Sequence, residues 1–132
     1  MNSLGQAPSL GSFPMFHDER GALGVAEFGP LPFHPRRLFW ISDVAPGETR
    51  ANHGHRHCEQ LVFVQEGAVG GFILDAFGDR LEFALTQGEW VYVPVRHWLQ
   101  LSGFTPTALV GVLASHPFDA DEYIDSPDEL NS

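Results

Sequence analysis

The sequence is a succession of short apolar runs, and a turn signal interrupts it about every eight to twelve residues. The runs are rich in Val, Phe, Leu and Trp, which favour strands, and pairs such as Gly78–Asp79 separate them. No long stretch has helical periodicity; only residues 119–124 are expected to form a short helical turn. We therefore predict an all-β sandwich or barrel. The clearest predicted strands cover residues 23–28, 38–44, 60–65, 69–75, 80–85, 90–94, 98–102 and 108–114.

A chain of 132 residues has the length of one domain. Residues 1–14 are rich in Ser, Gly and Pro, so we predict a flexible leader there. The folded domain is expected to cover residues 15–125. Residues 126–132 are polar and acidic, and we expect them to form a fraying tail.

The charge of the chain is strongly negative, with 17 acidic residues against 7 basic ones and a net charge near −10. Nucleic acids and anionic membranes need a positive surface, so we expect neither as a partner. A single phosphate-bearing ligand remains compatible with this charge, because a few arginines can bind phosphate through paired hydrogen bonds.

The cysteine content and the N-terminal segment bear on the compartment. Cys58 is the only cysteine, so an internal disulfide is impossible and a reducing compartment is expected. The first 14 residues lack the basic start and long apolar run of a signal peptide. No stretch approaches the roughly 18 apolar residues of a membrane-spanning helix. We expect a cytoplasmic protein.

Two segments distinguish this chain from other β-sandwiches. Residues 47–59 read GETRANHGHRHCE and are followed by an apolar strand and Gly67, and residues 88–94 read GEWVYVP. They resemble the two signature motifs of the cupin superfamily, the first completely and the second in part. The resemblance implies a double-stranded β-helix, or jelly-roll barrel, ending in the short C-terminal helical turn.

His53 and His55 are the strongest candidates for chemistry. Residues two apart on a strand project to the same face, so the two imidazoles should stand side by side. Imidazole both accepts and donates protons near neutral pH, which makes the pair a candidate proton-transfer site. We assign no function to His17, His34, His57 and His116.

A metal site is the first alternative. Metal-binding cupins use both histidines and the glutamate of the first motif, which here are His53, His55 and Glu59, and add a histidine from the second motif. Leu99 occupies that last position, and His97 lies two residues earlier. Three ligands can hold zinc or iron, but the apolar fourth position favours a site without metal.

A second resemblance covers most of the chain. It is similar to the sugar 3,4-ketoisomerases, the WxcM-like members of the RmlC-like cupin superfamily. The similarity rests on residues 18–21 (DERG), 37–41 (RLFWI), 50–55 (RANHGH), 93–94 (VP) and 118–124 (FDADEYI). It implies a metal-independent and cofactor-independent homodimer that moves the carbonyl of a dTDP-linked 4-keto-6-deoxy sugar from C4 to C3, ahead of 3-amino-sugar synthesis.

The resemblance also implies roles for individual residues. His53 and His55 would be the acid and base, one removing the C3 proton and the other moving protons at the oxygens or C4. Substrate-binding candidates are Arg50, Arg37, Trp98 and Asn52. The arginines are equally compatible with surface ion pairs, and the tryptophan with core packing.

The chain departs from the family pattern where the substrate would lie. Family members carry tyrosines near positions 39–42, where this chain has Phe39, Trp40, Ile41 and Ser42, and polar residues where it has Leu99 and Gln100. A more apolar site leaves a second function open, a non-catalytic cupin that binds nucleotide sugars.

Overall fold

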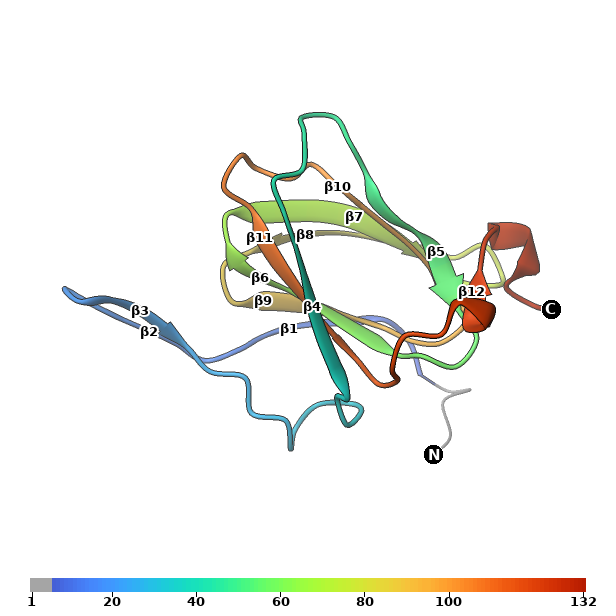
Figure 1. The fold of residues 1–132 in the computed structure, drawn as a ribbon, viewed down its shortest axis with the longest axis horizontal. Helices are drawn as coiled ribbons and strands as arrows, with labels where there is room; N and C mark the ends of the chain where they lie inside the picture. Colours follow the sequence, from blue (N-terminus) through green and yellow to red (C-terminus); the bar gives the residue numbers. More distant parts are fainter. Residues whose placement is uncertain (1–5) are drawn as a thin grey trace.

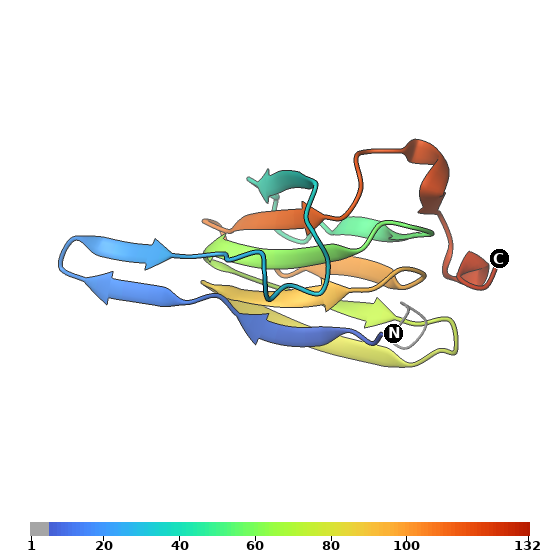
Figure 2. The ribbon, with the colours of Figure 1, turned by 90° about the horizontal axis from the view of Figure 1, so that it is seen from below.

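The computed structural model describes residues 6–132 and has the all-β architecture that the sequence predicts. Two five-stranded antiparallel sheets and a two-stranded hairpin make up the fold (Figures 1 and 2). The strands are β1 (Ser9–Ser12), β2 (Met15–Asp18), β3 (Gly21–Gly24), β4 (Arg37–Ser42), β5 (Arg50–His55), β6 (Gln60–Glu66), β7 (Ala68–Leu74), β8 (Arg80–Thr86), β9 (Glu89–Val93), β10 (Trp98–Ser102), β11 (Leu109–Ala114) and β12 (Tyr123–Ile124).

The first sheet has the strand order β1-β9-β6-β11-β4, and the second has the order β12-β5-β10-β7-β8. Strands adjacent in sequence, such as β5 and β6, therefore lie in different sheets, as in a jelly roll. The inner faces of the two sheets share one apolar core, because alternate residues of each strand point inward. Its buried members are Ile41, Val62, Val64, Val69, Ile73, Phe83, Leu85, Val91, Val93, Leu99, Leu101, Val110 and Val112.

The central strand β6 is buried on both faces, which explains its nearly continuous apolar sequence. Val62 and Val64 point into the core between the sheets. Leu61 and Phe63 point the other way and join a second cluster with Phe33, which the segment before β4 contributes. The long connection between β3 and β4 is thus held against the first sheet.

The N-terminal segment differs from its prediction. Residues 1–5 of the predicted flexible leader lie outside the described residues, but Ser9–Ser12 forms strand β1 at the edge of the first sheet. It pairs with β9 from Ser9 opposite Tyr92 to Ser12 opposite Glu89. Composition alone suggested a loose segment, because Gly11 and the serines have low strand propensity. The low strand propensity of this segment is offset by its pairing with the free edge of β9 and by the close packing of Gly11 on the Trp90 ring.

The C-terminal segment contains the predicted helical turn and more. The turn is the 3-10 helix η2 (Ala120–Glu122), where the Asp119 carboxylate accepts a hydrogen bond from the Asp121 N–H at 3.0 Å. A second 3-10 helix, η3 (Pro127–Glu129), follows where a fraying tail was expected. Leu130 anchors it with a side chain that is only 1% exposed. Neither short helix, nor any other in residues 6–132, is long and apolar enough to cross a bilayer.

Candidate active site

The paired histidines lie on β5, which is the strand between β12 and β10 in the second sheet. His53 stands opposite Leu99 of β10, and His55 stands opposite Tyr123 of β12. Their ring centroids are 4.8 Å apart in an edge-on arrangement, so the two imidazoles lie side by side as their spacing predicts. His53 lines a cavity of about 60 Å³ together with Gln60, Leu99 and mostly apolar neighbours, and His55 is buried behind it.

Gly54 allows the histidine pair to reach this position. A Cβ atom at Gly54 would lie 2.8 Å from the carbonyl oxygen of His97 and 3.3 Å from the side chain of Leu130. The outward face of β5 is therefore covered so closely at position 54 that only glycine fits there. The C-terminal anchor and the glycine together fix the depth at which both imidazoles sit.

An irregularity in β5 brings an arginine into the same cavity. The pairing register between β5 and β10 shifts by one residue just before His53, and Ala51 and Asn52 have φ angles of 71° and 60°. Such a β-bulge leaves Arg50 opposite Leu101 while His53 is opposite Leu99. Arg50 and His53 consequently line one cavity, although residues three apart on a regular strand face opposite sides.

A buried carboxylate from η2 completes the site. The Nδ1 atom of His55 is hydrogen-bonded to Oε2 of Glu122, and both side chains are nearly inaccessible to solvent. The other oxygen of Glu122 accepts hydrogen bonds from the backbone N–H groups of His57 at 3.0 Å and Cys58 at 3.1 Å. The carboxylate is thus oriented by the turn after β5 and in turn orients the imidazole.

The surroundings determine the charge states of these groups. Burial, with the neighbouring His55, lowers the pKa of His53 to about 4, and burial also lowers the pKa of His55. Burial alone would raise the pKa of Glu122, but hydrogen bonds from His57, His55 and Cys58 together hold it below its usual range. Near neutral pH the site therefore holds two neutral imidazoles and one carboxylate.

This arrangement fixes the tautomer of His55. Because Glu122 is ionised and can only accept, the His55 Nδ1 atom carries the proton and Nε2 keeps a free lone pair. Among residues 6–132, neither His55 Nε2 nor His53 Nδ1 has a hydrogen-bond partner, although both are buried. Two uncommitted nitrogens on adjacent rings are what a proton-transfer site needs.

Tyr123 and Arg37 form the rest of the site's wall. The Tyr123 ring lies 4.8 Å from the His53 ring and 4.6 Å from the His55 ring, which holds both imidazoles in place. The Arg37 guanidinium, at the start of β4, lies over the Phe39 ring at 5.2 Å, and its charge contributes to the lowered pKa of His55. The structure therefore brings Arg37 and Arg50 to the histidines.

The other two predicted substrate-binding residues, Asn52 and Trp98, do not point into the cavity as clearly as Arg50 does. The Asn52 amide accepts a hydrogen bond from Gln100 at 2.8 Å and donates one to Thr49 at 3.0 Å, so its visible role is to hold the bulge. Trp98 neighbours Leu99 on β10, and Leu99 faces the cavity, so the indole lies on the opposite face of the sheet. Their contacts with a substrate stay predictions.

The alternative metal set of His53, His55 and Glu59 does not fit the structure. The Glu59 carboxylate accepts a hydrogen bond from the Tyr92 hydroxyl, and burial beside this acid raises the pKa of Tyr92. In the part of the chain that the structure describes, the three side chains do not form a cluster of potential ligands. The side chain of Gln60, rather than that of Glu59, lines the cavity next to His53.

Three residues of this site were not predicted from the sequence: Glu122, Tyr123 and Gln60. The first two belong to the segment 118–124, which supported the family resemblance and the predicted helical turn but was given no part in the site. An acidic residue followed by an aromatic one in that segment was a usable signal. Gln60 was not predicted because the residue before it, Glu59, occupies the position where cupins have a metal ligand and was considered in its place.

Comparisons with known proteins identify the family of this chain. Residues 6–132 match the family model described as FdtA: WxcM-like, C-terminal. The TDP-4-oxo-6-deoxy-alpha-D-glucose-3,4-oxoisomerase of Aneurinibacillus thermoaerophilus is 30% identical over 115 residues, which cover 86% of this chain and 82% of that protein.

Solved structures of 3,4-ketoisomerases also have the same fold as this chain. A 3,4-ketoisomerase from Helicobacter canadensis superposes with a TM-score of 0.83 at 25% identity and covers 93% of both chains. QdtA, a sugar 3,4-ketoisomerase from Thermoanaerobacterium thermosaccharolyticum in complex with TDP, gives a TM-score of 0.86 at 25% identity, covering 93% of this chain and 90% of that one. The predicted resemblance is confirmed, and the chain belongs to the FdtA (WxcM-like, C-terminal) family of cupin-fold enzymes, as a ketoisomerase.

Proposed function

We propose that this protein isomerises a nucleotide-linked 4-keto-6-deoxy sugar to the 3-keto sugar by proton transfer at His53 and His55, as a step toward a deoxy amino sugar. The observation that carries the proposal is the buried unit of two neutral imidazoles and the Glu122 carboxylate. The names of the relatives supply the substrate class. We place the reaction in the cytoplasm, because Cys58 is a free thiol.

The reaction needs only proton transfer. A base removes the proton from C3, which gives an enediol or enediolate, and an acid returns a proton to C4. The C4 carbonyl becomes a hydroxyl while the C3 hydroxyl becomes a carbonyl, so the sugar as a whole is neither oxidised nor reduced. A pair of imidazoles near their neutral state can serve both half-reactions.

The geometry suggests a division of labour between the histidines. His53 lines the cavity and is therefore the residue that meets the sugar. His55 stands behind it with its Nδ1 proton committed to Glu122, so its Nε2 can take a proton from the neighbouring ring and return it later. Glu122 stabilises the imidazolium that forms during this transfer.

The two arginines are placed to bind the anionic part of the ligand. The chain carries a net charge near −10, so an approaching diphosphate is repelled unless local positive charge compensates. Arg50 lines the cavity beside His53, and Arg37 lies near enough to His55 for its charge to lower the pKa of that histidine. The cavity of about 60 Å³ has room for a small group at most, so the nucleotide must lie outside, across its mouth.

Incubation with dTDP-4-keto-6-deoxyglucose is expected to yield the 3-keto isomer. NMR of the ring protons in deuterated buffer measures its formation.

dTDP alone is expected to raise the melting temperature of the protein, because a ligand at 100 times its Kd adds about 2.7 kcal/mol of stability. Stabilisation without isomerisation would instead support a binding protein, the alternative favoured by apolar Phe39 and Leu99 at the cavity. No response to thymidine or uridine nucleotides would contradict both functions.

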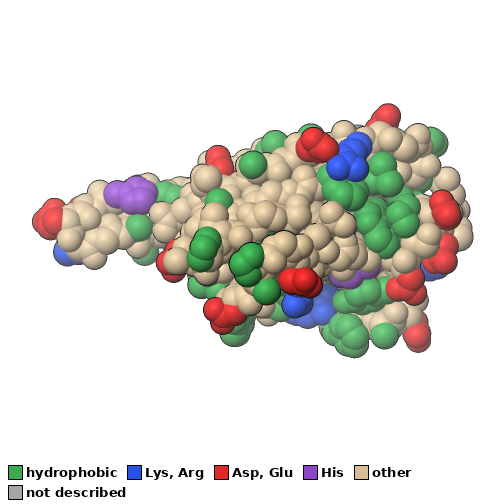
Figure 3. All heavy atoms as spheres, turned by 90° about the horizontal axis from the view of Figure 1, so that it is seen from above, with side chains coloured by type: hydrophobic (Ala, Val, Ile, Leu, Met, Phe, Trp, Pro, Cys, Tyr) green, Lys and Arg blue, Asp and Glu red, His purple; other side chains and the backbone are tan. Residues whose placement is uncertain are grey.

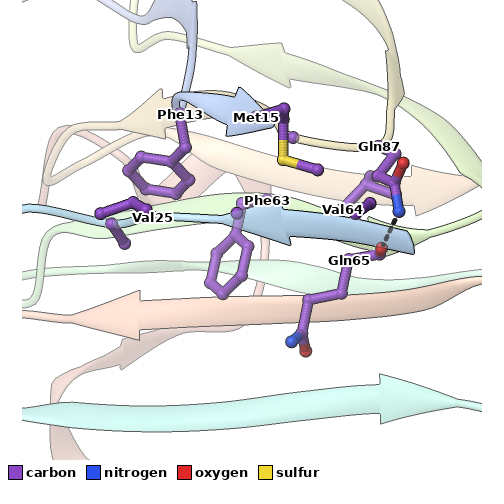
Figure 4. A pocket seen from close by; sticks show the side chains of 11 residues that line it. Phe13, Met15, Val25, Phe63, Val64, Gln65 and Gln87 are labelled. Carbon is purple, nitrogen blue, oxygen red and sulfur yellow. Dashed lines mark hydrogen bonds between the residues drawn. The ribbon is translucent and has the colours of Figure 1, made fainter. Parts of the chain in front are cut away.

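We also propose a homodimer, which rests on the β2–β3 hairpin. The hairpin projects from one end of the body (Figure 3), and it carries Phe16 and Leu23 directly opposite each other with exposed fractions of 59% and 62%. Beside it lies a groove of about 370 Å³, lined by apolar side chains such as Phe13 and Phe63 together with Gln65 and Gln87 (Figure 4). Two exposed apolar side chains on a projecting hairpin, next to a groove with uncharged walls, suit contact with a second copy.

Replacing both Phe16 and Leu23 with Asp is expected to convert the dimer to a monomer, because the charges would be buried at the interface. Sedimentation velocity measures the change. The matched control is His17→Asp, which adds a charge on β2 next to Phe16, at the position opposite Ala22 of β3. A wild-type protein that sediments as a monomer would contradict the proposed dimer.

A further inference from the structure

The side of His55 that faces away from the sugar cavity carries a second set of ligands. A ring nitrogen of His55, the Sγ atom of Cys58 and a carboxylate oxygen of Glu122 all lie within 4.8 Å of one another, and all three residues are buried. The His55 nitrogen that contacts Glu122 is Nδ1. Cys58 enters this set because the turn after β5 folds back on η2, so that its backbone N–H reaches Glu122. The proposed isomerisation gives its thiol no role.

This donor set has a definite chemical preference. One thiolate, one imidazole and one carboxylate form a mixed set that matches Zn²⁺ and Co²⁺, whereas Mg²⁺ and Ca²⁺ prefer oxygen alone. Three protein ligands leave a fourth tetrahedral position open for water. It is a different set from His53, His55 and Glu59, because it uses the Nδ1 side of the His55 ring and excludes His53.

The surrounding structure supports the ligands and gives access to them. The backbone N–H groups of His57 and Cys58 hold one oxygen of Glu122, which leaves the other directed at the His55 ring. A pocket of about 330 Å³, lined in part by His116, Phe118 and Glu122, opens to the carboxylate from outside. An oriented carboxylate and an entry path are two features that a metal site requires.

We propose that His55, Cys58 and Glu122 form an inhibitory site for a thiophilic divalent cation such as Zn²⁺. Binding displaces the thiol proton and the Nδ1 proton of His55 and replaces the hydrogen bond to Glu122 with two metal bonds. His55 then lacks its carboxylate partner and lies beside a positive ion, so it can no longer take up a proton. The inhibitory part of this inference rests on the proposed function, whereas the binding part does not.

Arg37 makes the affinity of this site testable in both directions. Its Nη2 atom lies 4.0 Å from the Cys58 sulfur, so the guanidinium competes with a cation for the same atom. Arg37→Gln is therefore expected to increase Zn²⁺ affinity by about 10-fold, and Cys58→Ala to decrease it by about 100-fold or more. A cation held by surface histidines would show neither effect.

Titration of the purified chain with Co²⁺ tests the binding. We expect one Co²⁺ per chain, a thiolate-to-cobalt absorption band in the near ultraviolet, and loss of that band on addition of Zn²⁺. The band should be absent in Cys58→Ala and in Cys58→Ser, two variants whose melting temperatures show whether they fold. His116→Ala is the matched control, because it removes a histidine from the entry pocket and not from the ligand set.

The binding inference is overturned if wild type shows no sulfur-to-cobalt band, or if His116→Ala rather than Cys58→Ala loses the ion. For the inhibitory part, Zn²⁺ should lower isomerase activity of wild type, EDTA should restore it, and Cys58→Ala should resist. Equal inhibition of both proteins overturns that part. An inactive protein that still shows the cobalt band would contradict the proposed function and leave the ion site standing.

Discussion

Replacing His53 or His55 with Asn is expected to lower kcat by about 1,000-fold or more, because each variant removes a proton carrier from the transition state. Asn has a similar size and keeps a polar group in the cavity, so the loss should come from chemistry rather than from packing. The measurement is the exchange of the C3 hydrogen of the keto sugar with deuterium from solvent, followed by NMR. His53→Asn should abolish this exchange, since His53 lines the cavity.

His97→Asn is the control for these variants. It removes a half-buried histidine whose Nδ1 atom is hydrogen-bonded to the backbone carbonyl of Val95 at 2.8 Å, and it should leave the exchange rate unchanged. Wild-type exchange in both His53→Asn and His55→Asn would show that the pair does not carry protons. Unchanged affinity for dTDP in all three variants would show that the binding site is intact.

The pH dependence of the wild-type enzyme follows from the same burial. An imidazole acts as a base only when it is unprotonated, and the pKa of His53 is lowered to about 4. We therefore expect kcat/KM to be constant from neutral pH down to about pH 5 and to fall only as the pH approaches 4. An unperturbed histidine would instead produce the fall near pH 6.5.

Glu122→Gln is expected to lower kcat by between about 100-fold and about 10,000-fold while KM changes little. The amide can donate to His55 Nδ1, which would move the ring proton to Nε2 and remove the lone pair that receives protons. Because the Glu122 side chain touches His55 and the backbone of the β5 turn rather than the cavity, substrate binding should survive. Steady-state kinetics separate the two effects.

Asp121→Asn is the matched control, since it makes the same chemical change one residue earlier on η2 at an exposed position. It should retain wild-type kcat. A Glu122→Gln variant with a raised KM and normal kcat would place the carboxylate in substrate binding, and Glu122→Asp should recover part of the activity if orientation of His55 is its role.

Much of the fold was predictable because its signals are local. The strands β6, β7, β8, β10 and β11 match their predicted ranges within about a residue or two, since each is a short apolar run bounded by turn residues. The prediction that the side chains of His53 and His55 lie on the same face of the sheet followed from strand geometry alone. The edge strands β1 and β12 were missed, because their stabilisation comes from partners distant in sequence, β9 and β5.

The candidate site was only half predictable for a related reason. Nothing local connects Glu122 to His55, which lies 67 residues earlier in the chain; the contact exists because β12 adds to the edge of β5 and η2 precedes it. Strand alternation alone would put Arg50 and His53 on opposite faces, and the bulge at Ala51 and Asn52 that brings them together leaves no clear mark in sequence. Long-range pairing and local irregularity are what a residue pattern does not encode.

The bulge in β5 has a consequence for how such sites are gained and lost. Arg50 and His53 share a cavity only because one surplus residue lies between them, held in place by the left-handed backbone of Asn52 and its amide contacts. Deleting a single codon there would keep every functional residue yet turn the arginine and the histidines to opposite sides of the sheet. A relative of this chain would therefore need the same number of residues between the arginine and the first histidine, as well as the two residues themselves, to keep both in one cavity.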